Sequence, residues 1–419
     1  MFFQNPLVNF GLAFLTALAV SAMSIPQIIY VAKRKRLFDV PDNHRKLHKR
    51  IVPNLGGIGI FMAFVLAGSL FVTPEQSTTW TYIVAATLLL FIIGVKDDLI
   101  AVSPTKKFVT QAVSSFIIVV IAGIRIKSFH GLFGLDQLPY WFSVAFTMVG
   151  CMFVTNAFNL IDGIDGLAGS IGLMGSLLFG VMLATNGHQS EAVIAFCMAG
   201  ALCGFLRYNI SPAKIFMGDT GSLVIGFTMC VLGILFLNAE HGASNAVRIG
   251  HHPTSALALA LAVLFIPIFD TFRVFATRIA KGHGPFRADR THLHHYLLDL
   301  GLNHTQAVGA IVSANLLIVL ACALLHGLNI HVVLMIQFCL ALVMYTAVFA
   351  LRRSRAAHAA VHHAVAHNAG LAEYINEGDD GTNNTKQGRL APTLPGAAFT
   401  VNGHKIRFDE PVQEPASIS

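Results

Sequence analysis

Long apolar stretches, each about the length of a bilayer-spanning helix, run through most of this chain. A helix needs roughly 20 mainly apolar residues to cross the hydrocarbon core of a membrane. By that measure the chain contains eleven spans, at 7–31, 54–73, 80–96, 107–124, 141–160, 167–185, 190–208, 222–238, 255–272, 305–326 and 331–351. Of its 419 residues, 55% are hydrophobic and only 12% are charged, which excludes a soluble globule and a largely disordered chain. The sequence therefore predicts an all-α, polytopic integral membrane protein.

The basic residues predict how the chain is oriented in the membrane. Four consecutive basic residues, 33–36, follow the first span. A cleavable signal peptide carries its positive charge before the apolar segment, so we expect an uncleaved helix with the N-terminus outside and, after eleven spans, a cytoplasmic C-terminus. Of the 28 Lys and Arg residues, this topology leaves only Arg125, Lys127 and Arg248 outside. The net charge of +7 thus reflects the placement of basic residues on the inner side of the membrane, and it does not indicate binding to nucleic acid.

The composition changes after the last span. Residues 1–351 are predicted to form the transmembrane domain. Residues 352–419 contain too few apolar side chains to fold alone, and they are predicted to form a mobile cytoplasmic tail.

Acidic residues collect at the predicted cytoplasmic ends of the spans. Asp97 and Asp98 end the third span, Asp162 and Asp165 follow the fifth, and Asp219 precedes the eighth. Carboxylates at membrane depth are costly and are functional candidates by default. For the adjacent pair, the alternative is a solvated helix end with neighbouring lysines as counterions.

Asparagines and glycines accompany these acids. Asn156 and Asn159 share a helix face with the first acid that follows the fifth span, and Gly163 and Gly166 allow close approach of a ligand to the backbone. Five carboxylates and two amides form an oxygen-rich set that suits Mg²⁺, or alternatively Mn²⁺, and such an ion is well suited to bridging phosphate oxygens.

Two basic segments on the same predicted side supply positive charge. Their candidate ligands for phosphate are Arg45 and His48 in the first segment, and Arg290, His292, His294 and His295 in the second. The alternatives are a topological anchor for the first segment and a solvated loop or a zinc site for the second. Together, the acids and the basic loops predict a cytoplasm-facing, Mg²⁺-dependent site for phosphoryl transfer.

These segments together resemble the polyprenyl-phosphate N-acetylhexosamine-1-phosphate transferase family, glycosyltransferase family 4. That family includes the phospho-MurNAc-pentapeptide translocase and the WecA- and TagO-type enzymes. The matching pieces occur in family order, and they are the Arg45/His48 segment, Asp97-Asp98, 156–167, 218–222 and 292–295.

The resemblance implies transfer of a sugar-1-phosphate from a UDP-sugar to undecaprenyl phosphate in a bacterial plasma membrane, with release of UMP. It implies Mg²⁺ ligands at Asn159 and Asp219. It also implies catalytic roles for Asp97 and Asp98, as bases toward the lipid phosphate or as a nucleophile in a two-step scheme. The substrate-binding positions that it implies are Lys107, Asp162 and Asp165 together with Arg45, His48, Arg290, His292, His294 and His295.

Within the family, the spacing of residues 289–295 is similar to the WecA/TagO branch, whereas the translocase more typically carries three consecutive histidines and one span fewer. We therefore expect UDP-GlcNAc or a related UDP-HexNAc as donor, for synthesis of a lipid-linked cell-envelope polysaccharide. The alternatives are the same transfer from UDP-MurNAc-pentapeptide, an ion-coupled transporter, and an inactive lipid-phosphate-binding scaffold. Acids gathered at one membrane face disfavour the transporter. The sequence leaves open whether the protein forms a homodimer.

Overall fold

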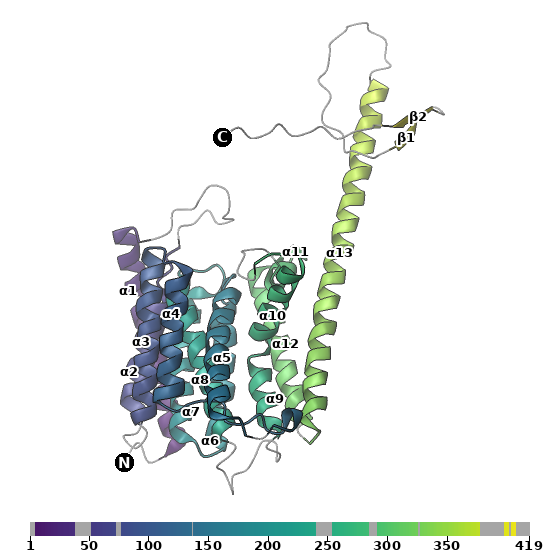
Figure 1. Cartoon of the computed structure of the whole chain (residues 1–419). Coiled ribbons are helices and arrows are strands. Elements are labelled where there is room, and N and C mark those ends of the chain that lie inside the picture. Colours follow the sequence, from purple (N-terminus) through teal and green to yellow (C-terminus); the bar gives the residue numbers. More distant parts are fainter. Residues whose placement is uncertain are drawn as a thin grey trace. The chain divides into compact units, whose positions relative to one another are not determined.

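The computed structural model is helical over most of the chain (Figure 1). It describes residues 5–37, 52–72, 77–135, 137–239, 254–284, 291–325, 327–377, 398–401 and 404–407. The chain divides into two compact units, Met1–Ala356 and Ala357–Ser419, each of which is described by itself below.

The described elements of the first unit are all helical, which confirms the predicted all-α class. In chain order they are α1 (Pro6–Lys35), α2 (Gly56–Phe71), α3 (Ser77–Leu99), α4 (Pro104–Phe116), the π-helix η3 (Ile117–Ile121), the 3-10 helix η4 (Leu132–Gly134), α5 (Tyr140–Ile161), α6 (Leu167–Thr185), α7 (Gln189–Asn209), α8 (Gly218–Ala239), α9 (Thr254–Val263), α10 (Phe265–Ala280), α11 (Leu293–Asp299), α12 (His304–Leu324) and α13 (Ile330–Glu377), the last of which continues into the second unit.

Each of the eleven predicted spans coincides with helix in the structure. Among the described residues, nine helices are long and apolar enough to cross a membrane, or ten if the bent pair α9 and α10 forms one span. Helix α2 is apolar but shorter, at 16 residues. The chain is thus a multi-pass membrane protein, whose backbone polar groups must be paired within helices because lipid offers them no partner. The count of eleven crossings stays a prediction.

The ninth predicted span, 255–272, consists of two helices and not of one continuous helix. Helices α9 and α10 meet at an angle of 74°. Pro267 has no N–H to donate to the carbonyl of Val263, so the helical ladder is interrupted there. The buried Asn315 of α12 takes up the freed groups: its Oδ1 accepts from the Ile266 N–H (3.0 Å), and its Nδ2 donates to the Val263 carbonyl (3.1 Å).

Helix α8 lies at the centre of the first unit, and almost all of its side chains are buried. Helices α2, α3, α5, α6, α7 and α9 contact it. Small residues allow two of these helices to approach its first turn very closely: a Cβ at Gly57 would lie 2.7 Å from the Gly221 Cα, and a Cβ at Gly94 would lie 2.5 Å from the Thr220 Cα. This packing brings the end of α3, which carries two aspartates, against the beginning of α8.

The second unit contains the end of α13 and a short antiparallel hairpin of β1 (Ala398–Val401) and β2 (His404–Arg407). In the hairpin, Ala398 is paired with Arg407. Helix α13 runs on past residue 351 as far as Glu377, so the first part of the predicted tail is helical. Its mobility and its cytoplasmic location stay predictions.

Candidate active site

The Asp98 carboxylate of α3 caps the N-terminus of α8. Its Oδ1 accepts from the Asp219 N–H (2.7 Å), and its Oδ2 accepts from the Thr220 N–H (3.0 Å) and hydroxyl (2.5 Å). The first N–H groups of a helix have no partner within the helix and favour a negative charge. This contact therefore fixes both the Asp98 carboxylate and the start of α8. Gly218 makes it feasible, because its φ is +72° and a Cβ there would lie only 2.5 Å from Asp98 Oδ2.

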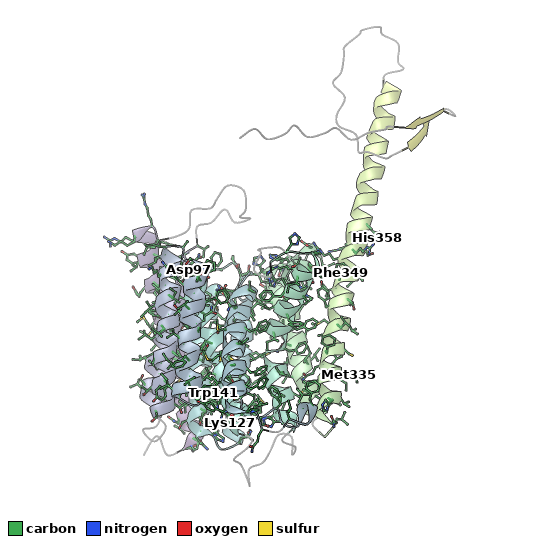
Figure 2. All side chains as sticks on the ribbon, viewed as in Figure 1. Asp97, Lys127, Trp141, Met335, Phe349 and His358 are labelled. Atoms are coloured by element: carbon green, nitrogen blue, oxygen red, sulfur yellow. The ribbon has the colours of Figure 1, made fainter. Side chains whose placement is uncertain are left out.

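Lys107 of α4 joins the other two carboxylates of this cluster. Its Nζ lies 2.6 Å from Asp97 Oδ2 and also donates to Asp219 Oδ2. The second oxygen of Asp97 accepts from the Val102 N–H at 2.6 Å. Four residues that the sequence singled out thus meet where α3, α4 and α8 come together. Figure 2 shows Asp97 near one end of the helices and Lys127 near the opposite end.

A cavity of about 310 Å³ opens beside this cluster. Five of the predicted site residues line it: Asp98, Asn159, Asp162, Asp165 and Asp219. Its wall also contains polar and aromatic side chains that the sequence analysis did not select, namely Asn54, Asn209, Phe216, Ser222 and His304. The cavity therefore collects carboxylates from the ends of α3 and α5 and from the start of α8.

The carboxylates around the cavity repel one another. Burial raises the pKa of Asp162 to about 7, and the negative charges of Asp219, Asp98 and Asp165 raise it in the same direction. A bound cation would relieve this repulsion by favouring the ionised forms.

The donor set fits Mg²⁺. Asn159 and Asp219 offer an amide and a carboxylate oxygen on the same cavity wall. Among the described residues, no group of three His, Cys, Asp or Glu side chains is arranged to hold a metal ion. A magnesium ion at this position would therefore complete its shell with water and substrate phosphates, which is its usual mode of binding in phosphoryl-transfer sites.

The histidine segment, residues 292–295, lies against α10 and does not line this cavity. The Nδ1 atom of His292 is 2.8 Å from Asp270 Oδ2, and the Leu293 N–H donates to Asp270 Oδ1 (3.1 Å). The side chain of Asp270 is buried. Sequence analysis missed this residue, although a lone carboxylate inside a predicted apolar span is itself a signal.

His294 lies behind the cavity wall. Its ring is buried and packs against Gly163, where a Cβ would lie 2.8 Å from the ring Cε1. Burial and, to a smaller extent, the adjacent His295 lower its pKa to about 3, so this imidazole is neutral near pH 7. The buried rings at positions 292 and 294 are placed to support the site and not to face its cavity.

The remaining predicted residues are placed as follows. Arg45, His48 and Arg290 lie outside the described residues. His295 is half-buried in α11. The imidazole Nδ1 of the newly found His304 lies 3.4 Å from Asp165 Oδ2, and Asp165 also accepts from the Ala213 N–H (3.2 Å). No pattern in the sequence distinguishes His304 from an ordinary residue at the start of a helix.

Comparison with known proteins supplies the family. The model of glycosyl transferase family 4 matches residues 80–237. A Bacillus subtilis (strain 168) protein described as a probable undecaprenyl-phosphate N-acetylglucosaminyl 1-phosphate transferase is 30% identical over 339 residues, which cover 81% of this chain and 91% of the relative. Proteins described as undecaprenyl-phosphate alpha-N-acetylglucosaminyl 1-phosphate transferases, from Yersinia pestis and Escherichia coli (strain K12), are each 32% identical over 72% of this chain, covering 78% and 77% of the relatives.

The segment that the family model matches contains every described predicted residue of the acidic cluster and its cavity, from Asp97 to Asp219. The similarity to the Bacillus relative extends well beyond that segment and covers most of both chains. The chain therefore belongs to glycosyl transferase family 4 and is a membrane-embedded phosphotransferase of that family.

Proposed function

We propose that this protein transfers GlcNAc-1-phosphate from UDP-GlcNAc to undecaprenyl phosphate, with Mg²⁺, at the cytoplasmic face of a bacterial plasma membrane. The observation that carries the proposal is a cavity that Asn159, Asp162 and Asp219 line together at one end of a membrane-spanning bundle. The names of the relatives support the GlcNAc-phosphate group and the lipid acceptor. A site at the membrane surface is accessible both to a soluble nucleotide sugar and to a lipid phosphate.

The proposed reaction forms one bond and breaks another. An oxygen of the lipid phosphate attacks the sugar-linked phosphorus of the donor, and the bond from that phosphorus to the bridging oxygen breaks, so that UMP leaves. Magnesium bound at Asn159 and Asp219 would neutralise charge on the diphosphate. Lys107, already between two carboxylates, adds a positive charge to the same region.

The contacts of the paired aspartates favour direct attack by the lipid phosphate over a covalent enzyme intermediate. Both oxygens of Asp98 accept hydrogen bonds from the start of α8. Both oxygens of Asp97 are also engaged, one by Lys107 and one by the Val102 N–H. A carboxylate whose two oxygens both accept hydrogen bonds is a weaker nucleophile than a free one, because these bonds stabilise its negative charge.

Release of UMP by detergent-purified protein tests this function. We expect release with undecaprenyl phosphate, Mg²⁺ and UDP-GlcNAc, and we expect EDTA to abolish it. UDP-MurNAc-pentapeptide, tested separately, should give none. Release with the pentapeptide donor alone would replace the proposed donor. No release with either donor, from protein with a cooperative unfolding transition, would contradict the proposed reaction.

His304 is expected to contribute to donor binding. Among the cavity-lining residues that the structure describes, it is the one whose side chain can carry a positive charge. Since a hydrogen bond to a charged group contributes about 1.5–3 kcal/mol, His304→Ala should raise the KM for UDP-GlcNAc at least about tenfold with little change in kcat. Initial-rate kinetics would measure this. His188→Ala, at a histidine that does not line the cavity, is the control, and equal KM values for the two variants would contradict the assignment.

A further inference from the structure

A buried carboxylate in α10 organises the start of α11. Asp270 is 3% exposed, and its two oxygens accept from three donors. Oδ2 faces the Nδ1 of His292 at 2.8 Å, whereas Oδ1 accepts from the Leu293 N–H (3.1 Å) and from Arg273 Nη2 (2.8 Å). A charge held this deeply in an apolar helix requires such a complete set of partners.

Arg273, one turn further along α10, binds the same segment. Its Nη2 also donates to the carbonyl of Thr291. Its Nη1 donates to the Tyr345 hydroxyl of α13 at 2.9 Å, and the guanidinium lies 4.3 Å from the centre of that ring. The Asp270–Arg273 pair therefore binds each of the residues 291–293.

The secured segment leads directly to the cavity wall. The rings of His292 and His294 are nearly parallel, with centres 5.8 Å apart. The His294 ring then packs against Gly163, which lines the cavity between Asp162 and Asp165. The His294 Nε2 is buried and has no hydrogen-bond partner among the described residues, so its contact with Gly163 is one of packing.

We propose that Asp270 and Arg273 are positioning residues, which hold His294 against Gly163 and thereby fix Asp162 and Asp165 in the cavity. Neither residue lines the cavity itself, so both act through the histidine segment. The inference rests on the proposed function only in that its first readout is the binding of the UDP-sugar.

Asp270→Asn tests the role with almost no change in volume. The amide oxygen should stay beside the two donors Arg273 and Leu293, which leaves the NH₂ group facing His292 Nδ1. A carboxylate accepts a hydrogen from this nitrogen, but an amide NH₂ donates one, so His292 must change its tautomer or move. We expect kcat/KM for UDP-GlcNAc to fall about 10- to 100-fold, the range typical of residues that orient a site from behind it.

The kinetic constants separate positioning from general destabilisation. If Asp270 fixes the wall that contains Asp162 and Asp165, the KM for UDP-GlcNAc rises and the KM for undecaprenyl phosphate is unchanged. A merely structural role would lower the active fraction and leave both KM values as they are, which would overturn the proposal. Arg273→Lys is the second variant, since it keeps the charge but loses the planar fork whose two terminal nitrogens bind Asp270, Thr291 and Tyr345.

A double-mutant cycle tests whether Asp270 acts through His294. We expect Asp270→Asn combined with His294→Ala to be no more than about threefold worse than the worse single variant, because both disturb one path. Effects that multiply would contradict a common path. Gly163→Ala should lose activity because its new methyl group overlaps the His294 ring, and adding His294→Ala should restore part of it.

Arg352→Gln is the matched control. Arg352 forms an ion pair with Asp299 (2.8 Å) and lies over the Tyr296 ring of α11, and within the described part of the chain it makes no hydrogen bond or ion pair with Asp270. We expect its kcat/KM to stay within about threefold of the wild type, as for other exposed ion pairs. The double-mutant cycle of Asp270→Asn and His294→Ala can also be measured by unfolding midpoints, which needs no substrate. An inactive wild type would therefore refute the proposed function alone, whereas additive midpoint shifts would refute the positioning path.

Discussion

Asp219→Ala is expected to lower the rate of UMP release by about 10³-fold or more, because it removes a proposed ligand of the cation that neutralises charge in phosphoryl transfer. The Asp219 side chain lines the cavity, accepts from Lys107 and lies on the same wall as Asn159. Removing it takes away a proposed metal ligand and leaves Lys107 with Asp97 alone. Initial rates at saturating donor and acceptor, measured over a range of Mg²⁺ concentrations, would quantify the loss.

The fold should survive this change. The backbone N–H of residue 219 still donates to Asp98, so the cap of α8 remains. We expect the unfolding midpoint to stay close to that of the wild type. Asp299→Ala is the control, since Asp299 is a partly exposed aspartate that pairs with Arg352 and does not line the cavity. Retention of wild-type turnover and of its Mg²⁺ dependence in Asp219→Ala would remove the metal assignment.

Much of this candidate site could be predicted from the sequence because its residues are charged or polar and stand out locally from the apolar segments beside them. Asp98, Asp162 and Asp219 stand at the ends of predicted spans, and the cavity brings these ends together. Successive spans run in opposite directions, so the chain comes back to the same membrane face after every second crossing. Polar residues at such ends therefore meet in space even when they are far apart in the sequence.

The division of roles within the pair Asp97-Asp98 could not be predicted. Consecutive residues of a helix point about 100° apart, so only one of two adjacent carboxylates can face a given neighbour. In the structure, Asp98 faces the start of α8 and the cavity, whereas Asp97 faces Lys107 and Val102. Which of the two faces α8 depends on the rotation of α3, and the close contact of Gly94 with Thr220 sets that rotation.

The role of the histidine segment could not be predicted from the sequence either. Three histidines beside an arginine indicate phosphate binding when the segment is considered alone. The structure adds Asp270, 22 residues before His292, as the partner that buries the first of them. The apolar pattern of 255–272 reveals neither this pairing nor the bend between α9 and α10, so sequence periodicity could not identify the partner of His292.

Gly218→Ala is expected to abolish turnover and to destabilise the protein. Residue 218 has a φ of +72°, which costs a residue other than glycine about 1–2 kcal/mol. The added Cβ would also lie 2.5 Å from Asp98 Oδ2 and 2.6 Å from its Oδ1, so the carboxylate must leave the N-terminus of α8. Displacing it would free the N–H groups of Asp219 and Thr220 and move the Asp219 side chain within the cavity.

Gly123→Ala separates the two causes. Gly123 has almost the same φ, +71°, but a Cβ there would meet nothing within 4 Å. This variant should therefore lose only the backbone term of about 1–2 kcal/mol and should keep wild-type turnover. Unfolding midpoints and UMP release, measured side by side, would show the difference. If the two variants lose equal stability and both remain active, then Asp98 does not need its place against α8, and the cap is not what holds Asp219 in the site.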